Sequence, residues 1–350
     1  MPLRRIHFQQ DPLAIPQQDT MAFTIFITAP SLAPAGLRIL EDAGCRLLFM
    51  RDGNDAAEVA QILASEPVDA IISRTVTLSG AALRSCPTLK VISKHGVGVP
   101  NIDVAAATER GIPVYVTPGA NAQSVAELTL GLMLAAARKV ALLDAELRAG
   151  RWTRAQDGVQ LAGRRLGLVG FGQVGQRVAK VALALGMEVE AFDPGLRGAS
   201  PVEGVALHAT LDSLLPRADV LSLHIPLNAN TRGLFDAARL ALLPRAAILV
   251  NTARGEVIDE NALVAALRSG ALFAAGLDTM AVEPLPADSA LAALPNVVLT
   301  PHVGGSTAAA LEAMATGAAR NVLGFLTGRA PEACACVNPQ VFSPNNQSIR

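Results

Sequence analysis

The sequence predicts an α/β protein with two doubly wound parallel-sheet domains. Three observations lead to this prediction. The chain has 350 residues, more than one hydrophobic core usually serves, because domains close at roughly 100–200 residues each. Short β-rich runs alternate with helical runs in two series, which begin at Phe23 and at Arg165. Between the two series the alternation stops, at Thr117-Pro118-Gly119.

The first series predicts a parallel sheet that is covered by helices on both faces. Single helices separate its strands, and this pattern implies right-handed crossovers. The strands are expected at residues 23–29, 45–50, 69–73, 90–94 and 112–116, with helices near 34–43, 55–64, 79–85 and 101–110.

The second series predicts another parallel sheet. A long apolar helix is expected from Ser124 to about Leu147, with Glu127 completing a capping box, and it leads into this sheet. The strands are expected at residues 165–171, 187–193, 220–226, 246–253, 272–278 and 297–303, and helices at 173–185 and 260–269. A last helix, near 307–326, has no strand left to pair with, so we expect it to return to the first domain.

The composition limits the kinds of partner. Hydrophobic residues make up 51% of the chain and charged residues 17%, yet the longest apolar run, Leu128 to Ala137, spans only ten residues. A bilayer crossing needs about 20, so buried helices and parallel strands explain the apolar excess better. The formal net charge is −1, whereas proteins that bind nucleic acids or membrane surfaces usually have an excess of basic residues. We therefore expect a small-molecule partner, no nucleic acid and no membrane.

The cysteines and the N-terminal segment indicate a reduced, cytoplasmic protein. Cys45, Cys86, Cys334 and Cys336 have no metal-ligand spacing, so we expect no metal site, and we interpret the last two as incidental. Residues 1–22 are rich in Gln and Pro where a signal peptide would be apolar. They predict a flexible N-terminal arm.

A glycine-rich turn is the most specific local motif. Gly170, Gly172 and Gly175 follow the strand at 165–171 and open the helix at 173–185. Such glycines permit a tight turn, close approach of backbone N–H groups to a pyrophosphate, and close packing of the helix on the strand. The helix N-terminus adds partial positive charge.

An acidic residue strengthens this motif. Asp193 ends the next strand, 18 positions after Gly175, and a spacing of about 20 is expected for a carboxylate that accepts the ribose hydroxyls. The motif and Asp193 together predict a Rossmann domain that binds NAD. Asp193 would repel a 2′-phosphate, which favours NAD over NADP, although Arg197 lies close behind it.

Three residues at or beyond strand ends form a candidate catalytic group. Open α/β sheets place ligands at the carboxyl ends of their strands, where Arg254, Glu283 and His302 are expected. Reduction of a keto acid needs a cation for the carboxylate, and arginine binds carboxylates bidentately. It also needs a proton donor for the carbonyl oxygen, and histidine titrates closest to physiological pH. A carboxylate beside the imidazole, here Glu283, would orient it.

Each member of this group has an ordinary alternative explanation. Arg254 could form a surface ion pair, Glu283 could be a loop residue, and His302 could be structural. Their joint occurrence beside a dinucleotide motif favours catalysis.

Two further histidines compete for the role of acid/base. His208 has no evident partner in the sequence. His224 ends a strand over the cofactor crevice with Ile225 and Pro226, and there it would shape the wall of the crevice rather than move protons.

The sequence resembles the family of D-isomer-specific 2-hydroxyacid dehydrogenases, from about Phe23 to Pro339. It is most similar to the phosphoglycerate-dehydrogenase-like branch, without the C-terminal regulatory domain that some members carry. The segments that carry the resemblance are KHGVGVPNID (94–103), NAQSVAELTLGLMLAAAR (121–138), GLVGFGQVG (167–175), NTARGEVIDE (251–260), GLDTMAVEPLP (276–286) and TPHVGGST (300–307).

The resemblance implies a domain division. A flavodoxin-like substrate domain would comprise residues 23–120 and 305–340, and a Rossmann NAD domain residues 121–304, with a C-terminal tail at 341–350. The active site would lie in the cleft between the two domains. The helix that begins near Ser124 would build a two-fold dimer interface, so the resemblance implies a homodimer or a larger assembly.

The resemblance also implies roles for individual residues. Arg254 would bind the substrate carboxylate, Glu283 would pair with His302, and His302 would be the acid/base. The backbone around Val97 and Gly98 would close over the substrate. NAD would contact the glycine turn and a further set of residues, Asp278 through the nicotinamide carboxamide: Gln173, Val174, Asp193, Ile225, Pro226, Thr252 and Asp278.

Substrate choice is expected to depend on the other domain. Phosphoglycerate dehydrogenases tend to have arginines where this chain has Arg74 and Lys94. Arg74 and Lys94, with His95 as a further donor, would bind a second anion such as a phosphate, carboxylate or sulfonate. The alternative is that Lys94 points to solvent.

Two other functions share this fold. One is NAD sensing by a corepressor-like binding protein, against which the complete Arg, Glu and His set argues. The other is formate oxidation, whose branch has Gln where this chain has Glu283.

Overall fold

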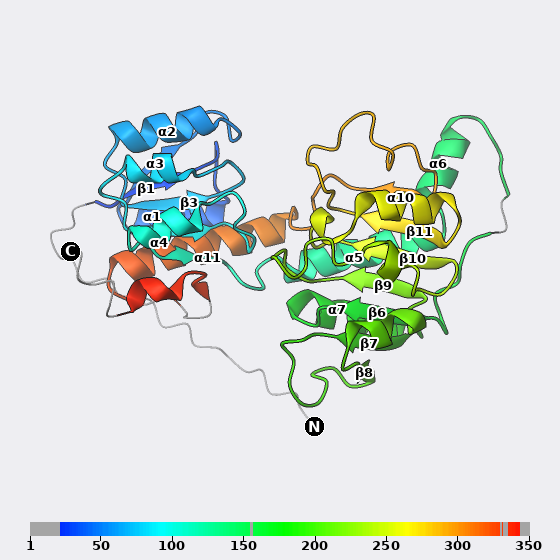
Figure 1. The fold of residues 1–350 in the computed structure, drawn as a ribbon. Helices are drawn as coiled ribbons and strands as arrows, with labels where there is room; N and C mark the ends of the chain where they lie inside the picture. The colour runs from blue at the N-terminus through cyan, green and yellow to red at the C-terminus, as the bar shows by residue number, and fades with distance from the viewer. Residues whose placement is uncertain (1–21, 155–156, 330, 332–334, 344–350) are drawn as a thin grey trace, which may run out of the picture.

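Two parallel sheets form the protein, each with helices on both faces (Figure 1). The computed structural model describes residues 22–154, 157–329, 331 and 335–343. Most of the expected N-terminal arm, Cys334 and residues 344–350 of the expected tail lie outside the described residues. The predicted fold class, two doubly wound α/β domains, is confirmed.

The first sheet has the strand order β2-β1-β3-β4-β5, which is the flavodoxin-like order. All of its strand pairs are parallel. Its strands are β1 (Thr24–Ile27), β2 (Arg46–Phe49), β3 (Ala70–Ser73), β4 (Val91–Lys94) and β5 (Val114–Tyr115). Its helices are α1 (Pro34–Asp42), α2 (Ala56–Ser65), α3 (Gly80–Arg84) and α4 (Val104–Glu109). Strands β1, β3 and β4 are buried along their whole length, because helices cover both faces.

The second sheet has the order β12-β11-β10-β9-β6-β7-β8, which contains the Rossmann order. Its strands are β6 (Arg165–Val169), β7 (Glu188–Phe192), β8 (Val205–Leu207), β9 (Val220–Leu223), β10 (Ala247–Asn251), β11 (Leu272–Leu277) and β12 (Val297–Leu299). Its shorter helices are α7 (Gln173–Ala184), α8 (Leu211–Leu214), η1 (Leu215–Arg217), α9 (Ala237–Leu240), η2 (Gly255–Val257) and α10 (Glu260–Arg268). The order reverses at β6, where β7 and β9 pair with its two edges.

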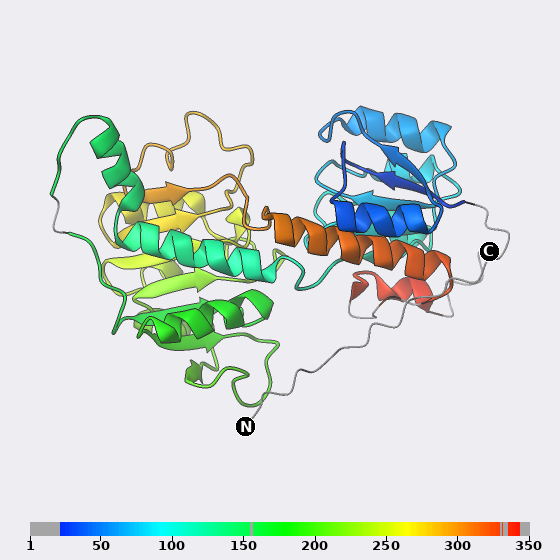
Figure 2. The ribbon, with the colours of Figure 1, turned by 180° about the vertical axis from the view of Figure 1, so that it is seen from behind.

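The last helix, α11 (Ala308–Leu326), packs against α1, β3 and β4 of the first sheet. Figure 2 shows it reaching from the region between the two lobes along the back of the first. The short helix η4 (Pro339–Phe342) follows, and residues 335–337 hydrogen-bond to the outer edge of β5. Among the described residues, no helix is long and apolar enough to cross a membrane.

The prediction of one long helix from Ser124 to about Leu147 is wrong. The segment forms α5 (Ala122–Ala137) and α6 (Val140–Arg148), because Lys139 takes a left-handed φ of 52°. The capping box is also wrong, since the Ser124 hydroxyl donates to the Gly304 carbonyl at 2.6 Å instead of capping its own helix.

Strand β8 was not predicted from the sequence. This strand has three residues, two of them exposed, at the outer edge of the second sheet. It lacks both the length and the apolar content that mark the other strands.

Candidate active site

The carboxyl ends of the second sheet's strands carry the candidate catalytic and cofactor residues. Arg254 follows β10, Glu283 follows β11 and His302 follows β12, and these strands are neighbours in the sheet. The glycine turn follows β6, and Asp193 follows β7. The three candidate catalytic residues and the cofactor motif therefore lie along the same edge of the second sheet, where its strands have their carboxyl ends.

The glycine turn has the shape of a pyrophosphate cradle. A Cβ on Gly170, whose φ is +91°, would lie 2.4 Å from the His224 carbonyl oxygen, and a Cβ on Gly175 would lie 2.5 Å from the Gly170 oxygen. Gly172, which caps α7, has open space where its Cβ would be. A ligand can therefore approach the first turn of α7 at Gly172, and the partial positive charge of that helix end suits a pyrophosphate.

Asp193 is held next to this cradle. Its Oδ2 accepts from the Phe171 backbone N–H at 2.8 Å, and its Oδ1 accepts from that of Gly195 at 2.8 Å. Arg197 donates to the carbonyl of Pro194 and forms no ion pair with Asp193. The residues around the turn fit NAD, because a fixed carboxylate at this position accepts ribose hydroxyls and repels a 2′-phosphate.

Glu283 and His302 form a hydrogen-bonded pair. His302 Nδ1 lies 2.7 Å from Glu283 Oε2, and the other Glu283 oxygen accepts from the Met280 backbone N–H at 3.1 Å. Both side chains are partly open to solvent, with His302 44% exposed. His302 also has a left-handed φ of 55°, an uncommon conformation for a residue with a side chain. The loops around the pair must therefore hold this backbone in place.

Asp278 holds the His302 loop. Its carboxylate accepts hydrogen bonds from the Thr300 hydroxyl at 2.7 Å and from the backbone N–H groups of Val303 and Gly304, both at 2.8 Å. The His302 N–H donates to the Asp278 carbonyl at 2.8 Å. Asp278 is almost fully buried, so the contact with nicotinamide that the resemblance implies for it stays a prediction.

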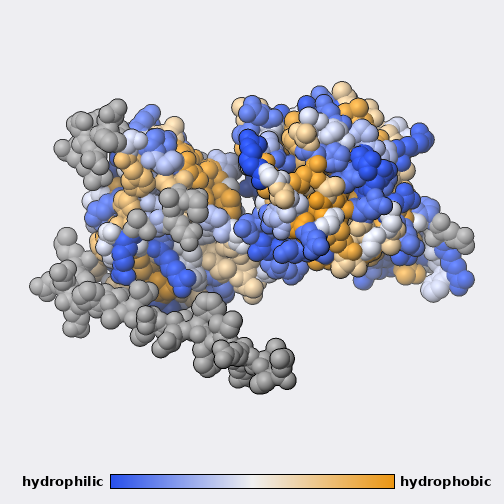
Figure 3. All heavy atoms as spheres, turned by 90° about the horizontal axis from the view of Figure 1, so that it is seen from below, coloured by the Kyte–Doolittle hydropathy of each residue, from blue (hydrophilic) through white to orange (hydrophobic). Residues whose placement is uncertain are grey.

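Arg254 carries a cation into the space between the two lobes, which face each other across a narrow cleft in Figure 3. Asn251 fixes its loop by donating from Nδ2 to the Arg254 carbonyl at 2.8 Å and accepting from the Ala253 N–H at 3.0 Å. A Cβ on Gly98, in the loop after β4, would lie 2.0 Å from Arg254 Nη2. Within the described part of the chain, Arg254 forms no ion pair.

Arg74 follows β3, and Lys94 is the last residue of the neighbouring strand β4. The Lys94 ammonium donates to the Arg74 carbonyl and to Asn101 Oδ1, the latter at 2.6 Å, and does not point to solvent. Burial first, and then the charges of Arg254 and Arg74, lower the pKa of Lys94 to about 8. Three cationic groups therefore converge on the cleft.

His95 lies beside these groups and is buried. Burial first, and then the charge of Arg74, lower the pKa of His95 to about 4, so the ring is neutral near pH 7. Its Nε2 has no hydrogen-bond partner among the described residues. The ring is therefore available to a ligand as a neutral donor or acceptor.

His208, for which the sequence shows no evident partner, has two in the structure. His208 Nε2 lies 2.7 Å from the buried Glu190 and Nδ1 lies 2.9 Å from the Ser213 hydroxyl, so the ring belongs to a structural network at the β7 edge. His224 Nε2 bonds the Ser222 hydroxyl at 2.9 Å, and burial lowers its pKa to about 4. It stays neutral and forms part of the wall behind Gly170.

Two asparagines that organise the site, Asn101 and Asn251, were not predicted from the sequence. Asn101 accepts from Lys94 and donates to the Arg74 and Val76 carbonyls, at 3.2 and 2.8 Å. Asn251 fixes the Arg254 loop as described above. Both lie within or beside the motifs 94–103 and 251–260, but only the folded chain shows which groups their amides contact.

The Rossmann sheet, the glycine cradle and the residues at its strand ends define a dinucleotide-dependent dehydrogenase. The family model of the D-isomer specific 2-hydroxyacid dehydrogenase NAD binding domain matches residues 130–304, half of the chain. The chain is 46% identical over 249 residues to the hydroxypyruvate reductase of Thermotoga maritima, covering 69% of this chain and 80% of that one.

Two further comparisons agree. The chain is 40% identical over 318 residues to the D-3-phosphoglycerate dehydrogenase of Methanocaldococcus jannaschii, covering 88% of this chain and 58% of that one. The NAD-dependent formate dehydrogenase of Staphylococcus aureus, solved with NAD, superposes with a TM-score of 0.80 at 26% identity, covering 90% and 99% of the two chains. The chain belongs to the family of D-isomer specific 2-hydroxyacid dehydrogenases. It is an NAD-dependent enzyme that interconverts 2-hydroxy acids and 2-keto acids, as the sequence predicts.

Proposed function

We propose that Arg254, Glu283 and His302 carry out the reaction in the cleft. The guanidinium of Arg254 and the backbone N–H groups of the Val97–Gly98 loop bind the substrate carboxylate. His302 delivers a proton to the carbonyl oxygen of the keto acid, and Glu283 orients the imidazole and stabilises its protonated form. NADH, when bound, supplies the hydride that C2 of the keto acid receives.

One observation carries this proposal. The 2.7 Å His302–Glu283 pair and the guanidinium of Arg254 follow three neighbouring strands, at the edge where the glycine turn lies. A proton donor and a carboxylate receptor are therefore fixed on one rigid sheet, and such positioning is what lowers a reaction barrier. The cofactor would lie along the same edge, on Gly170, Gly172, Gln173, Val174, Gly175, Asp193, Ile225, Pro226, Thr252 and Asp278.

The preferred substrates, we propose, carry a second anionic group. Arg74, Lys94 and Arg254 converge on the cleft, and no Asp or Glu among the described residues forms an ion pair with any of them. One substrate carboxylate would neutralise only one of these charges. A second carboxylate, a phosphate or a sulfonate on the substrate, bound by Arg74, Lys94 and His95, would balance the remaining positive charge. The similarity to a phosphoglycerate dehydrogenase agrees with this class of substrate.

The protein, we further propose, is a cytoplasmic homodimer. Helix α6 has no buried residue and stands at the periphery of its lobe (Figure 1). Leu134 of α5, Val140 and Leu147 of α6, and Trp152 after it are exposed, Trp152 by 77%. Apolar groups of this kind gather where a second copy would bury them. The three described cysteines, all free, support the cytoplasmic location. Light scattering after gel filtration tests the dimer, with one chain mass as the contrary result.

The domain division at residues 23–120 with 305–340, and 121–304, also stays a proposal. The packing of α11 against α1, β3 and β4 supports it. Expression of residues 121–304 alone, followed by thermal unfolding, would test it. A cooperative transition is expected, and its absence would contradict the division.

The proposed catalytic roles are tested with NADH and five keto acids: hydroxypyruvate, phosphohydroxypyruvate, glyoxylate, oxaloacetate and sulfopyruvate. His302→Gln is expected to lower kcat by at least about 100-fold, the usual contribution of a general acid, and to leave the dissociation constant of NADH unchanged. Glu283→Gln keeps a hydrogen bond to His302 but removes the negative charge, so its kcat should fall by less than that of His302→Gln. Unchanged turnover in His302→Gln would refute the mechanism. Binding of NADH without reduction of any keto acid by the wild type would favour a binding protein.

A further inference from the structure

Two active-site loops meet backbone to backbone at Gly255. A Cβ built on Gly255 would lie 1.9 Å from the carbonyl carbon of Met280, 2.1 Å from its oxygen and 2.4 Å from the nitrogen of Ala281. The φ of Gly255 lies outside the left-handed region, so the requirement for glycine here is one of space. An ordinary contact begins at 3.4 Å, and any side chain would therefore push the loops apart by about 1.5 Å.

Each of these loops carries a residue of the proposed chemistry. Gly255 directly follows Arg254. Met280 donates its backbone N–H to Glu283 Oε1 at 3.1 Å, and the other oxygen of Glu283 holds His302. The Gly255–Met280 contact thus links the loop of the carboxylate receptor directly to the loop of the proton donor.

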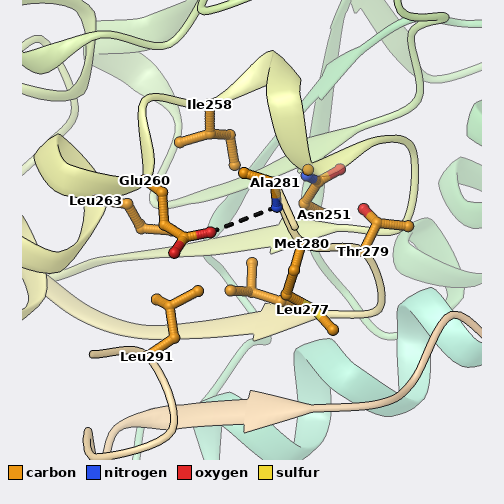
Figure 4. A pocket seen from close by; sticks show the side chains of 10 residues that line it. Asn251, Ile258, Glu260, Leu263, Leu277, Thr279, Met280, Ala281 and Leu291 are labelled. Atoms are coloured by element: carbon orange, nitrogen blue, oxygen red, sulfur yellow. Dashed lines mark hydrogen bonds between the residues drawn. The ribbon is translucent and has the colours of Figure 1, made fainter. Parts of the chain in front are cut away.

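Hydrogen bonds fix both loops on either side of this contact. The buried Asn251 holds the Arg254 carbonyl, and its own carbonyl accepts from the Asp278 N–H at 2.9 Å. Glu260, at the start of α10, accepts from the Ala281 N–H at 3.4 Å. Figure 4 shows Asn251, Met280, Ala281 and Glu260 converging from three elements, with the Glu260 bond dashed. The loops cannot absorb a new atom at Gly255 without moving Arg254 or the Glu283 loop.

We propose that Gly255 is a positioning residue, whose missing side chain sets the separation between Arg254 and the His302–Glu283 pair. This inference rests on the proposed function of those three residues. Misplacing catalytic groups by about 1 Å can cost about 100-fold in rate. Gly255→Ala is therefore expected to lower kcat/KM for hydroxypyruvate by about 100-fold. NADH binding should stay within about twofold of the wild type. The glycine cradle and Asp193 lie on other loops, and Thr252 and Asp278 are buried at the ends of β10 and β11, before the two loops meet.

Gly167→Ala provides a matched control. Its Cβ would lie 2.7 Å from the Ala218 side chain and 3.4 Å from Leu214, inside the same sheet but remote from both loops. Both variants should unfold at lower temperature than the wild type. Three readouts are compared between them. The dissociation constant of NADH should be the same in both variants, whereas the dissociation constant of oxamate for the NADH complex and the deuterium isotope effect on kcat/KM, measured with NADH deuterated at both C4 positions, should differ.

The expected result for Gly255→Ala is oxamate binding at least tenfold weaker, unchanged NADH binding and a larger isotope effect, since hydride transfer becomes more strongly rate-limiting. Gly167→Ala should change the unfolding temperature alone. Wild-type oxamate affinity in Gly255→Ala, or the same catalytic loss in Gly167→Ala, would overturn the proposal.

Two further measurements apply if Gly255→Ala does not fold or if the wild type is inactive. If Gly255→Ala is insoluble, Asn251→Ser releases the same loop without adding an atom, and unchanged oxamate affinity in that variant would overturn the proposal. If the wild type reduces no keto acid, the proposed function fails. The oxamate measurement still decides whether Gly255 positions Arg254, because it needs no turnover.

Discussion

Removing the charge of Lys94 tests how the enzyme selects its substrate. The side chain is only 9% exposed, and its ammonium faces Arg74 and Arg254. Its pKa is lowered from 10.5 to about 8. At about 1.4 kcal/mol per pH unit, the protein therefore destabilises the protonated amine, relative to the neutral one, by roughly 3 kcal/mol. An anion beside the amine would offset that cost, and a hydrogen bond to a charged group contributes about 1.5–3 kcal/mol.

Lys94→Met keeps the length of the side chain and removes this charge. We expect kcat/KM for sulfopyruvate, whose sulfonate stays ionised, to fall by about tenfold to 100-fold. For hydroxypyruvate, which has one carboxylate, the change should stay within about threefold. Lys90→Met is the matched control, because Lys90 directly precedes β4, the strand that ends at Lys94, and its exposed side chain forms an ion pair with Asp69.

The substrate preference should also depend on pH, in a direction that the protonation of Lys94 determines. Lys94 is protonated below about pH 8, so in the wild type the ratio of kcat/KM for sulfopyruvate to that for hydroxypyruvate should fall as the pH rises through 8. In Lys94→Met the ratio should be flat. The assay is NADH oxidation, followed by absorbance between pH 6.5 and 9.5. An equal loss for both substrates, or a wild-type ratio that does not change across pH 8, would refute the reasoning.

Two further predictions concern substrate affinity and stability. Gly98→Ala places a methyl group 2.0 Å from Arg254 Nη2, so the KM for hydroxypyruvate should rise by about tenfold or more while the NADH dissociation constant stays unchanged; an unchanged KM would contradict this contact. Glu190→Gln should lower the free energy of unfolding at pH 7 by about 1–3 kcal/mol, because the buried carboxylate binds Arg217 and His208. Arg217, and after it His208, hold the pKa of Glu190 below its ordinary value, so this stabilisation is present above the ordinary pKa of a glutamate and is lost as the pH falls through the lowered one. Urea unfolding at pH 7 and at successively lower pH measures the difference between wild type and variant, and a difference that does not shrink as the pH falls below the ordinary pKa of 4.5 would count against this prediction.

The periodic parts of the fold were predictable from the sequence. Runs such as 69–73 and 220–226 are apolar and bounded by turns, so hydrophobic patterning alone places strands there. The glycine turn and Asp193 depend on local spacing, which a sequence displays directly. For the same reason Arg254, Glu283 and His302 could be assigned to strand ends before the strands were paired.

The remaining features depend on contacts between distant segments. The break at Lys139 lies in an apolar stretch that reads as continuous helix, and the exposed strand β8 lacks the apolar content of a buried one. The bond between His208 and Glu190 joins residues 18 positions apart through the pairing of β7 with β8. Gly255 gives no local signal of its contact with Met280, because that contact exists only when the loops after β10 and β11 pack together.

The stereochemical course of reduction tests the central claim most directly. Hydroxypyruvate should be incubated with the enzyme and NADH that carries deuterium at both C4 positions, and the glycerate formed should be examined for deuterium and configuration. Transfer of one deuterium to C2, with D configuration at that carbon, is the predicted result, and His302→Gln should slow this transfer by at least about 100-fold. Formation of the L isomer, absence of deuterium at C2, or transfer of the label by His302→Gln at the wild-type rate would contradict the account.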